Sequence, residues 1–399
     1  MSKRVAGAAG TDVVTPPARA GARPLRPTRA EIDLDAIAHN VREVRELVAP
    51  AEVVAVVKAD GYGHGAVAVA RTALAAGATR LAVALLEEAE ELREAGVTAP
   101  ILLLSEPNPE AAGRTVAAGV VPTLYTVDFG EALRIEAGRR GRPIRVHVKA
   151  DTGMARVGVP PAEWDSFLEV LRAWPALEVE ALWTHLACAD TPGDPTVPEQ
   201  LDRFDQFLEI ARSQGFQPTL IHVANSAAAL TLKRSHRDAV RLGIAMYGCP
   251  PSSALAGAGN LRPALRLVTE VAFAKRIEAG TPVSYGHTWR APEGGWLATL
   301  PIGYADGLPR LLSNRAEVLV AGKRRPVVGT VCMDQILVWC GEQEVALGDE
   351  VVLIGRRGRE EISVLDWAQW ARTITYEIVT GLGPRVPRVY RGPSVAGEE

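Results

Sequence analysis

The stretch that decides the expected fold reads Val53-Val54-Ala55-Val56-Val57-Lys58-Ala59-Asp60-Gly61-Tyr62-Gly63-His64-Gly65. Its first residues are apolar and mostly β-branched, a pattern typical of a strand buried on both faces. Lys58 stands where this run stops, and the glycines that follow let the backbone turn sharply. Desolvation at the end of a buried strand lowers the pKa of an amine, and the neutral amine is the form that attacks carbonyl groups. The alternative is a lysine that only marks a strand end and reaches solvent.

Size and composition indicate a globular protein of about two domains, because 399 residues exceed what one hydrophobic core normally serves. The net charge of -3 gives no basic field for nucleic acid or an anionic membrane surface. No apolar run is long enough to cross a bilayer. The four cysteines form no CxxC pair and no Cys/His metal spacing, so we expect no metal site, reduced thiols and a cytoplasmic enzyme.

A regular alternation of strands and helices begins at Val53. Runs that predict strands, with a helical pattern between each and the next, are residues 53–57, 81–85, 101–104, 122–125, 144–149, 179–185, 219–224 and 239–243. Each connection is long enough for the helical crossover that parallel strands need. About eight such units predict an α/β fold, the closed (β/α)8 barrel. The alternative is an open doubly wound sheet, although no GxGxxG follows the first strand to support dinucleotide binding.

The two ends of the chain have a different texture. Residues 1–28 are rich in Ala, Gly, Pro and Arg, which predicts a disordered extension and no secretory signal. A short strand over 31–34 and a helix capped by Asp35 come next. After about Leu261 an all-β domain is expected, with strands at 268–273, 296–301, 316–320, 327–330, 335–339 and 350–354 and one helix at 364–371. The expected domains are therefore a barrel over 29–262 and a β domain over 263–399.

Polar residues follow several barrel strands, at the end where the active sites of such barrels lie. They are Lys58, Lys149 with Asp151, Arg156, His185, Asn225, Ser226 and Arg241, which Gly243 follows. Each has a structural explanation when taken alone: a packed histidine, a helix cap or a surface ion pair. Together they offer an amine after the first strand and, at Ser226 and the Gly243–Ile244 backbone, an anion site after the last two. Pyridoxal phosphate needs both, an amine for its aldehyde and an anchor for its phosphate.

Longer motifs resemble the alanine racemase family, in order, over nearly the whole chain after Ala30. Besides the stretch around Lys58, they are residues 147–158 (HVKADTGMARVG), 184–187 (THLA), 224–228 (ANSAA), 241–244 (RLGI), 284–286 (SYG), 301–307 (PIGYADG), 331–335 (VCMDQ) and 375–377 (TYE). The resemblance implies a barrel followed by a C-terminal β domain. It also implies a head-to-tail homodimer in which the partner's β domain completes each active site.

The same resemblance assigns roles to individual residues. Lys58 would hold pyridoxal 5'-phosphate covalently, His185 would stack against its ring and Arg156 would meet its phenolic oxygen. Arg156 and Met333 would meet the substrate carboxylate. The remaining cofactor-binding assignments are Tyr62, Asn225, Ser226, Gly243, Ile244 and Tyr376, mainly around the phosphate. Tyr304 and Tyr376 would narrow the channel and favour a small side chain.

Racemisation requires a proton to leave one face of Cα and return to the other. Lys58 covers one face, and Tyr285 of the partner chain is the candidate for the other. Tyrosine has an ordinary pKa of about 10, so Tyr285 needs nearby positive groups, which a His185–Arg241 chain would supply. Arg241 would donate a hydrogen bond to the pyridine nitrogen without protonating it. In some family members the lysine matching Lys149 is carbamylated, and carbamylation here would relieve the like charge of Arg156.

The resulting interpretation is an enzyme that interconverts L- and D-alanine and supplies D-alanine for peptidoglycan. Racemisation of another small amino acid such as serine is an alternative. A decarboxylase of basic amino acids on the same plan is a second, but it would need a carboxylate at the pyridine nitrogen and a catalytic cysteine, for which Cys332 is the candidate. A non-catalytic regulatory protein built on the barrel is a third, and the β domain and Tyr285 argue against it.

Overall fold

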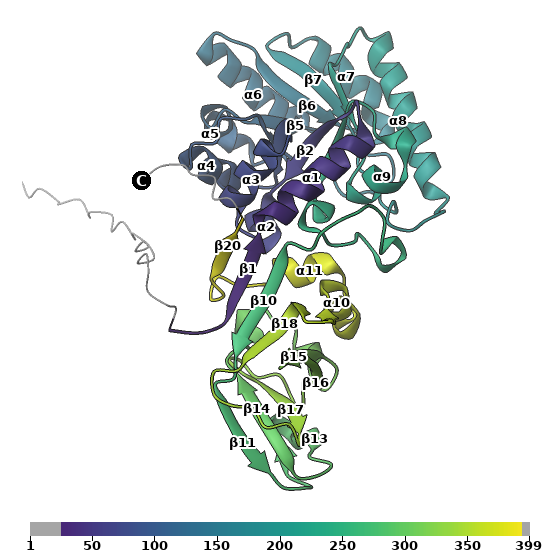
Figure 1. The fold of residues 1–399 in the computed structure, drawn as a ribbon. Helices are drawn as coiled ribbons and strands as arrows, with labels where there is room; N and C mark the ends of the chain where they lie inside the picture. The colour runs from purple at the N-terminus through teal and green to yellow at the C-terminus, as the bar shows by residue number, and fades with distance from the viewer. Residues whose placement is uncertain (1–24, 393–399) are drawn as a thin grey trace, which may run out of the picture.

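The computed structural model describes residues 25–392, and it shows a barrel joined to a β-rich domain (Figure 1). Eight parallel strands close the barrel, and the first pairs with the last, with Val54 opposite Arg241. They are β2 (Glu52–Val56), β3 (Arg80–Val83), β4 (Ile101–Leu103), β5 (Val121–Leu124), β6 (Ile144–Lys149), β7 (Leu177–Trp183), β8 (Leu220–His222) and β9 (Ala239–Leu242). The predicted barrel is confirmed, and the open sheet is excluded.

Helices surround this barrel and alternate with its strands (Figure 1). They are α1 (Leu34–Val48), α3 (Ala66–Ala75), α4 (Leu86–Glu94), α5 (Ala112–Ala117), α6 (Val127–Arg140), α7 (Trp164–Arg172), α8 (Thr196–Ser213) and α9 (Ser226–Thr231), with the short turn α2 (Lys58–Gly63) after β2. The predicted cap of α1 at Asp35 is wrong. The Asp33 side chain accepts the hydrogen bond from the Ala36 amide at 3.0 Å, and Asp35 lies in the first turn, where a carboxylate suits the helix dipole.

The C-terminal domain is built from sheets, as predicted, and within the described residues their strand pairs are antiparallel except β1 with β20. The larger sheet has the order β16-β15-β18-β10-β1-β20, with β19 paired to β18, and the smaller has the order β11-β14-β17. Their bounds are β1 (Arg29–Asp33), β10 (Leu265–Glu270), β11 (Phe273–Ile277), β14 (Gly295–Leu300), β15 (Glu317–Val320), β16 (Lys323–Pro326), β17 (Ile336–Gly341), β18 (Glu350–Arg357), β19 (Glu360–Ile362) and β20 (Arg388–Arg391), beside the two-stranded β12 (Pro282–Val283) and β13 (Trp289–Arg290). The strand predicted at 327–330 is wrong, because only Val327 makes an isolated bridge there and β16 precedes it.

The N-terminal segment belongs to the C-terminal sheet. Strand β1 runs antiparallel to β10 and parallel to β20, so the chain enters the β domain before it builds the barrel (Figure 1). Thr28 is fully buried and its hydroxyl donates to the Pro301 carbonyl at 2.7 Å, and Arg26 bonds to Asp306. Arg26 and Thr28, predicted to lie in a disordered extension, are therefore fixed against the β domain. Residues 1–24 lie outside the described part, and the domain limits stay a prediction.

Two helices fill the junction between barrel and β domain: α10 (Val364–Ala371), which was predicted, and α11 (Thr375–Thr380), which was not. A Cβ at Gly63 would lie only 2.3 Å from the Val379 carbonyl oxygen, so α11 is packed closely against the turn after Lys58. Within the described part of the chain, no helix is long and apolar enough to span a membrane.

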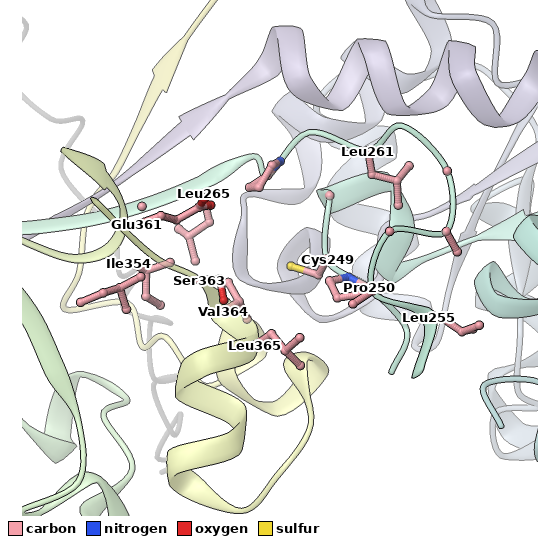
Figure 2. Close-up of a pocket in the computed structure, with 18 residues that line it drawn as sticks. Cys249, Pro250, Leu255, Leu261, Leu265, Ile354, Glu361, Ser363, Val364 and Leu365 are labelled. Carbon is pink, nitrogen blue, oxygen red and sulfur yellow. The ribbon is translucent and has the colours of Figure 1, made fainter. Parts of the chain in front are cut away.

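Next to α10 is a pocket of about 200 Å³, lined mostly by apolar groups from the segment after β9 and from the start of α10 (Figure 2). Cys249 is its thiol, and burial raises the pKa of that thiol to about 12. A protonated thiol is a poor nucleophile, so Cys249 gives this pocket no reactive group. We therefore interpret the pocket as a packing gap at the domain junction.

Candidate active site

A cavity of about 600 Å³ opens at the carboxyl ends of the barrel strands. It brings together the predicted residues of the barrel and one from α11: Lys58, Tyr62, Lys149, Arg156, His185, Asn225, Ser226, Arg241, Gly243, Ile244 and Tyr376. Trp183, at the end of β7, also lines the cavity and was not singled out from the sequence. This agreement supports the predicted location of the site.

The backbone after Lys58 is unusual. Ala59, Asp60, Gly61 and Tyr62 form one left-handed turn with φ between 51° and 59°. Left-handed backbone costs roughly 1–2 kcal/mol for each residue that carries a Cβ, and such strain is concentrated at functional sites. Hydrogen bonds from the Ala66 amide to Asp60 (2.8 Å) and from the Ala59 amide to Glu88 (2.6 Å) hold the turn. The strained turn fixes where Lys58 leaves strand β2.

Four cations face this cavity, and no carboxylate among the described residues lines it. They are Lys58, Lys149, Arg156 and Arg241. Burial and then the charge of Arg156 lower the pKa of Lys58, against the opposing effect of Glu88, as expected for an amine that must act in its neutral form. An excess of basic groups of this kind suits a ligand that carries negative charge.

Arg241 is buried and held from several sides. Its Nη2 donates to the Thr184 and Val223 carbonyls and to Nδ1 of His185 at 2.9–3.0 Å, and Nη1 bonds Nδ1 of His222 at 2.9 Å. None of its hydrogen bonds within residues 25–392 uses Nε. Burial lowers the pKa of Arg241 to about 9, so it stays protonated at neutral pH and Nε–H remains for an acceptor in the cavity.

Lys149 is 2% exposed and has no carboxylate within ion-pair distance among the described residues. Its Nζ donates to the Val157 carbonyl at 2.7 Å and lies 5.1 Å from the centre of the Trp183 ring. Burial, followed by the charges of Arg156 and Arg241, lowers the pKa of Lys149 to about 8. The amine is therefore partly neutral near neutral pH, which is the state that reacts with carbon dioxide.

The opposite corner of the cavity offers hydroxyl and amide groups. The Ser226 hydroxyl accepts from the Gly243 and Ala245 amides at 2.9 and 3.4 Å, so these donors converge on one point. A Cβ at Gly243 would lie 2.8 Å from the Tyr62 hydroxyl, so a side chain at this position would displace that hydroxyl. Tyr376 adds a second phenol, and the centre of its ring lies 6.2 Å from the centre of the Tyr62 ring. This corner suits a phosphate.

Asn225 has a clear structural role as well. It is the N-cap of α9, and its side chain accepts from the Ala228 amide at 3.1 Å and donates to the Leu186 carbonyl at 3.4 Å. The helix-cap explanation considered from the sequence therefore describes Asn225, although the residue also lines the cavity.

Three predicted residues lie elsewhere in the chain. Tyr285, Tyr304 and Met333 are 73%, 42% and 52% exposed and belong to the C-terminal domain. Tyr285, with Cys332, lines a separate hollow of about 450 Å³, and β13 beside it lies near the tip of that domain, away from the barrel (Figure 1). A single chain does not bring Tyr285 to Lys58, so a shared site would require a second chain.

Comparison with known proteins identifies the family. Residues 32–251 match the family model described as alanine racemase, N-terminal domain, and residues 264–390 match the model of the alanine racemase C-terminal domain. The chain belongs to the alanine racemase family. The family match covers both the barrel and the β domain in the predicted order.

Individual members of the alanine racemase family are similar over nearly their whole length. The alanine racemase of Symbiobacterium thermophilum is 47% identical over 92% of this chain and 98% of its own. The crystal structure of alanine racemase from D-cycloserine producing Streptomyces lavendulae is 43% identical, with a TM-score of 0.89 over 93% of this chain and 98% of that one. A histidine racemase from Leuconostoc mesenteroides is more distant, at 30% identity and a TM-score of 0.84 over 93% and 99%.

The cofactor of the alanine racemase family, pyridoxal 5'-phosphate, fits the residues of this cavity. Lys58 offers an amine of lowered pKa, and Arg241 offers an Nε–H donor that no protein group takes up within residues 25–392. The Ser226–Gly243 corner offers converging polar groups, and the glycine leaves the Tyr62 hydroxyl in place beside them. The surrounding cations balance the negative charge of a phosphate and a phenolate.

Proposed function

We propose that this protein is a pyridoxal phosphate-dependent alanine racemase that interconverts L- and D-alanine. The observation that carries the proposal is Lys58, whose pKa is lowered, in a cavity whose lining within residues 25–392 holds basic side chains and no carboxylate. Membership of the alanine racemase family supports the same activity. The D-alanine would supply peptidoglycan synthesis in the cytoplasm.

The basic side chains of the cavity would have distinct roles in this reaction. Pyridoxal phosphate, when bound, withdraws electrons from Cα of the attached amino acid and makes its proton removable. Lys58 Nζ takes or returns that proton on one face. Arg241 donates a hydrogen bond and does not release a proton, so it limits electron withdrawal and favours reprotonation over side reactions. Arg156, with Met333 of the second chain, would orient the substrate carboxylate.

The second face of Cα requires a second proton carrier, for which we propose Tyr285 of a partner chain in a head-to-tail homodimer. Support comes from position: Tyr285, Tyr304 and Met333 lie on the C-terminal domain and are open to solvent in one chain, so they are free to contact a second chain. The Tyr304 amide donates to the Cys332 carbonyl at 3.0 Å, which holds the Tyr304 and Met333 loops together. Such a fixed group suits insertion into a partner's cavity.

The cavity argues against the decarboxylase alternative. A carboxylate at the pyridine nitrogen would be needed, and none among the described residues lines the cavity, whereas Arg241 does. Cys332 shares the hollow of Tyr285, with its sulfur 3.5 Å from the Ser284 hydroxyl. Cys332→Ser should therefore keep racemase activity, and loss of all activity would favour the alternative.

The direct test is to incubate the purified protein with L-alanine and follow D-alanine, with and without added cofactor. We expect conversion in both directions, dependent on the cofactor. Serine, lysine and histidine serve as competing substrates, because the fold is shared with a histidine racemase. Turnover of a larger amino acid equal to that of alanine would contradict the proposed specificity, and no turnover of alanine would refute the function.

A further inference from the structure

A continuous line of polar side chains crosses the interior of the barrel beneath Arg241. Glu180 Oε2 lies 3.3 Å from His147 Nε2, His147 Nδ1 lies 3.1 Å from His222 Nε2, and His222 Nδ1 lies 2.9 Å from Arg241 Nη1. These residues come from strands β7, β6, β8 and β9, and each is at most 7% exposed. The interiors of such barrels are usually filled by branched aliphatic side chains, so four polar side chains in contact are unusual there.

The line has only one consistent set of proton positions. Arginine only donates, so Nδ1 of His222 must accept, and a neutral His222 then carries its proton on Nε2. His147 Nδ1 must accept that proton's hydrogen bond, and His147 therefore carries its own proton on Nε2 and donates it to Glu180. Donation therefore runs one way along the line, from Arg241 through both rings to the carboxylate of Glu180.

The charges around the line support this assignment. Burial lowers the pKa of His222 well below its ordinary value, and burial also lowers the pKa of His147 against its hydrogen bond to Glu180. The hydrogen bond from His147, opposed by burial and aided by Arg80 and Arg145, lowers the pKa of Glu180 to about 2. Both rings are therefore neutral and the carboxylate is charged at neutral pH.

A purely structural role explains the line poorly. Well-packed apolar side chains of similar volume are often as stabilising as buried ionic groups, or more so. An ion pair of Glu180 with Arg80, at 3.0 Å, would need neither histidine. The two histidines are explained if their role is to hold Arg241, at the other end of the line, in one orientation towards the cavity.

We propose that Glu180 is a positioning residue of the racemase: through His147 and His222 it fixes the acceptor that holds Arg241 beneath the cofactor. The inference rests on the proposed function, since it assigns a task to Arg241 in cofactor binding. It extends the active site from the cavity to the amino-terminal half of the barrel interior.

The variant Glu180→Gln tests the direction of the line. Glutamine has one acceptor oxygen, and the donors of Arg80 and Arg145, at 3.0 and 3.5 Å from Oε1, will claim it. The amide N–H then faces the Nε2–H of His147, so two donors must meet somewhere on the line; if both rings reverse, they meet between His222 and Arg241. The matched control is Glu52→Gln, which removes a carboxylate 3.5 Å from Arg80 but lies off the line.

Two quantities are measured on each variant: the apparent dissociation constant of pyridoxal phosphate from the apoprotein, and kcat and KM for L-alanine. We expect Glu180→Gln to weaken cofactor binding and lower kcat, each by about tenfold or more, since two donors then face each other. Glu52→Gln should stay within about twofold of wild type. Equal behaviour of the two variants, whether both normal or both impaired, would overturn the proposal.

Neutron diffraction from crystals of the wild-type holoenzyme provides a second test that needs no variant, in case Glu180→Gln does not fold. It should show deuterium on Nε2 and not on Nδ1 of both His147 and His222, and deuterium on His222 Nδ1 would overturn the proposal. If wild type binds the cofactor but does not racemise alanine, the proposed function fails, while the binding comparison and the proton positions still decide the role of Glu180.

Discussion

Replacing Arg26 with alanine should destabilise the C-terminal domain, although Arg26 lies in a segment predicted to be disordered. Its guanidinium donates to both carboxylate oxygens of Asp306, at 2.7 and 2.5 Å, and to the Pro301 carbonyl at 3.0 and 2.6 Å. Asp306 is fully buried, and it also accepts from the Gly303 amide at 2.9 Å next to the Tyr304 loop. The first described residues therefore anchor a loop assigned to substrate binding.

The size of the effect follows from what remains after the substitution. Leaving a buried carboxylate without a cation costs about 3–5 kcal/mol. Arg385, with Nε at 3.2 Å from Asp306, remains as a second cation, and the Arg26 side chain is itself 28% exposed. We therefore expect the free energy of unfolding to fall by about 2 kcal/mol. The control Arg276→Ala breaks an exposed pair with Glu342 and should cost less than about 0.5 kcal/mol.

A double-mutant cycle in urea isolates this pair. Arg26→Ala, Asp306→Asn and the double variant are unfolded while the tryptophan fluorescence of the protein is followed. We expect a coupling energy of about 1–2 kcal/mol between the two positions. A coupling below about 0.5 kcal/mol would refute the argument that Arg26 compensates the buried charge.

The pH dependence gives an independent check on the same pair. Burial alone would raise the pKa of Asp306, but hydrogen bonds from Arg26 and the Gly303 amide, with the charges of Arg26 and Arg385, hold it below its ordinary value. A depressed carboxyl pKa contributes stability that is present at neutral pH and lost as pH falls through the folded-state pKa. Wild type and Arg26→Ala should converge in stability at acidic pH, and a constant difference down to the lowest pH would contradict the pairing.

Three further predictions concern the active site. Tyr285→Phe should lower racemisation about a thousandfold and leave the absorbance of the bound cofactor unchanged, whereas loss of that absorbance would indicate a structural role. Gly243→Ala should weaken cofactor binding about tenfold, since its Cβ would lie 2.8 Å from the Tyr62 hydroxyl. Binding equal to that of the control Gly113→Ala, whose Cβ would have 3.9 Å of clearance, would contradict this. The pKa of Lys149 is lowered to about 8, so its neutral amine becomes more abundant as pH rises. With ¹³C-labelled bicarbonate, Lys149 should therefore form a carbamate at pH 8 and much less of it at pH 6. A ¹³C NMR spectrum without a Lys149-dependent carbamate signal would contradict this prediction.

The barrel and its lysine were predictable because their signals are local. Each buried parallel strand is a short apolar run, and Lys58 stands at the end of the first. Polar residues at the carboxyl ends of successive strands must meet at one edge of a parallel barrel. For this reason the sequence alone predicted that His185, Ser226 and Arg241 lie close together.

Features that depend on distant pairing could not be predicted from local signals. Strand β1 pairs with β10 and β20, more than 230 residues away, and nothing in its own pattern shows that it leaves the barrel. Helix α11 is six residues long and, unlike the equally short α9, does not lie between two parallel strands whose connection requires a helix. Its Tyr376 was found by family resemblance, whereas its contact with the turn after Lys58 required the structure.

The polar line through the barrel was missed for a different reason. His147 lies two residues before Lys149 on β6 and shares its inward face, and His222 occupies the end of β8. An inward histidine on a barrel strand can be either a packed core residue or part of a network. Only the distances to Glu180 and Arg241 decide between these explanations.

The central claim is that Lys58 of one chain and Tyr285 of another act on the same substrate. Mixed dimers of Lys58→Ala and Tyr285→Phe test it most directly, since each variant alone should be inactive. In a twofold-symmetric dimer, the mixed species has one site with both defects and one site intact, so random pairing should restore about a quarter of wild-type activity. Purified mixed dimers should reach about half, and no recovery of activity in them would contradict the account.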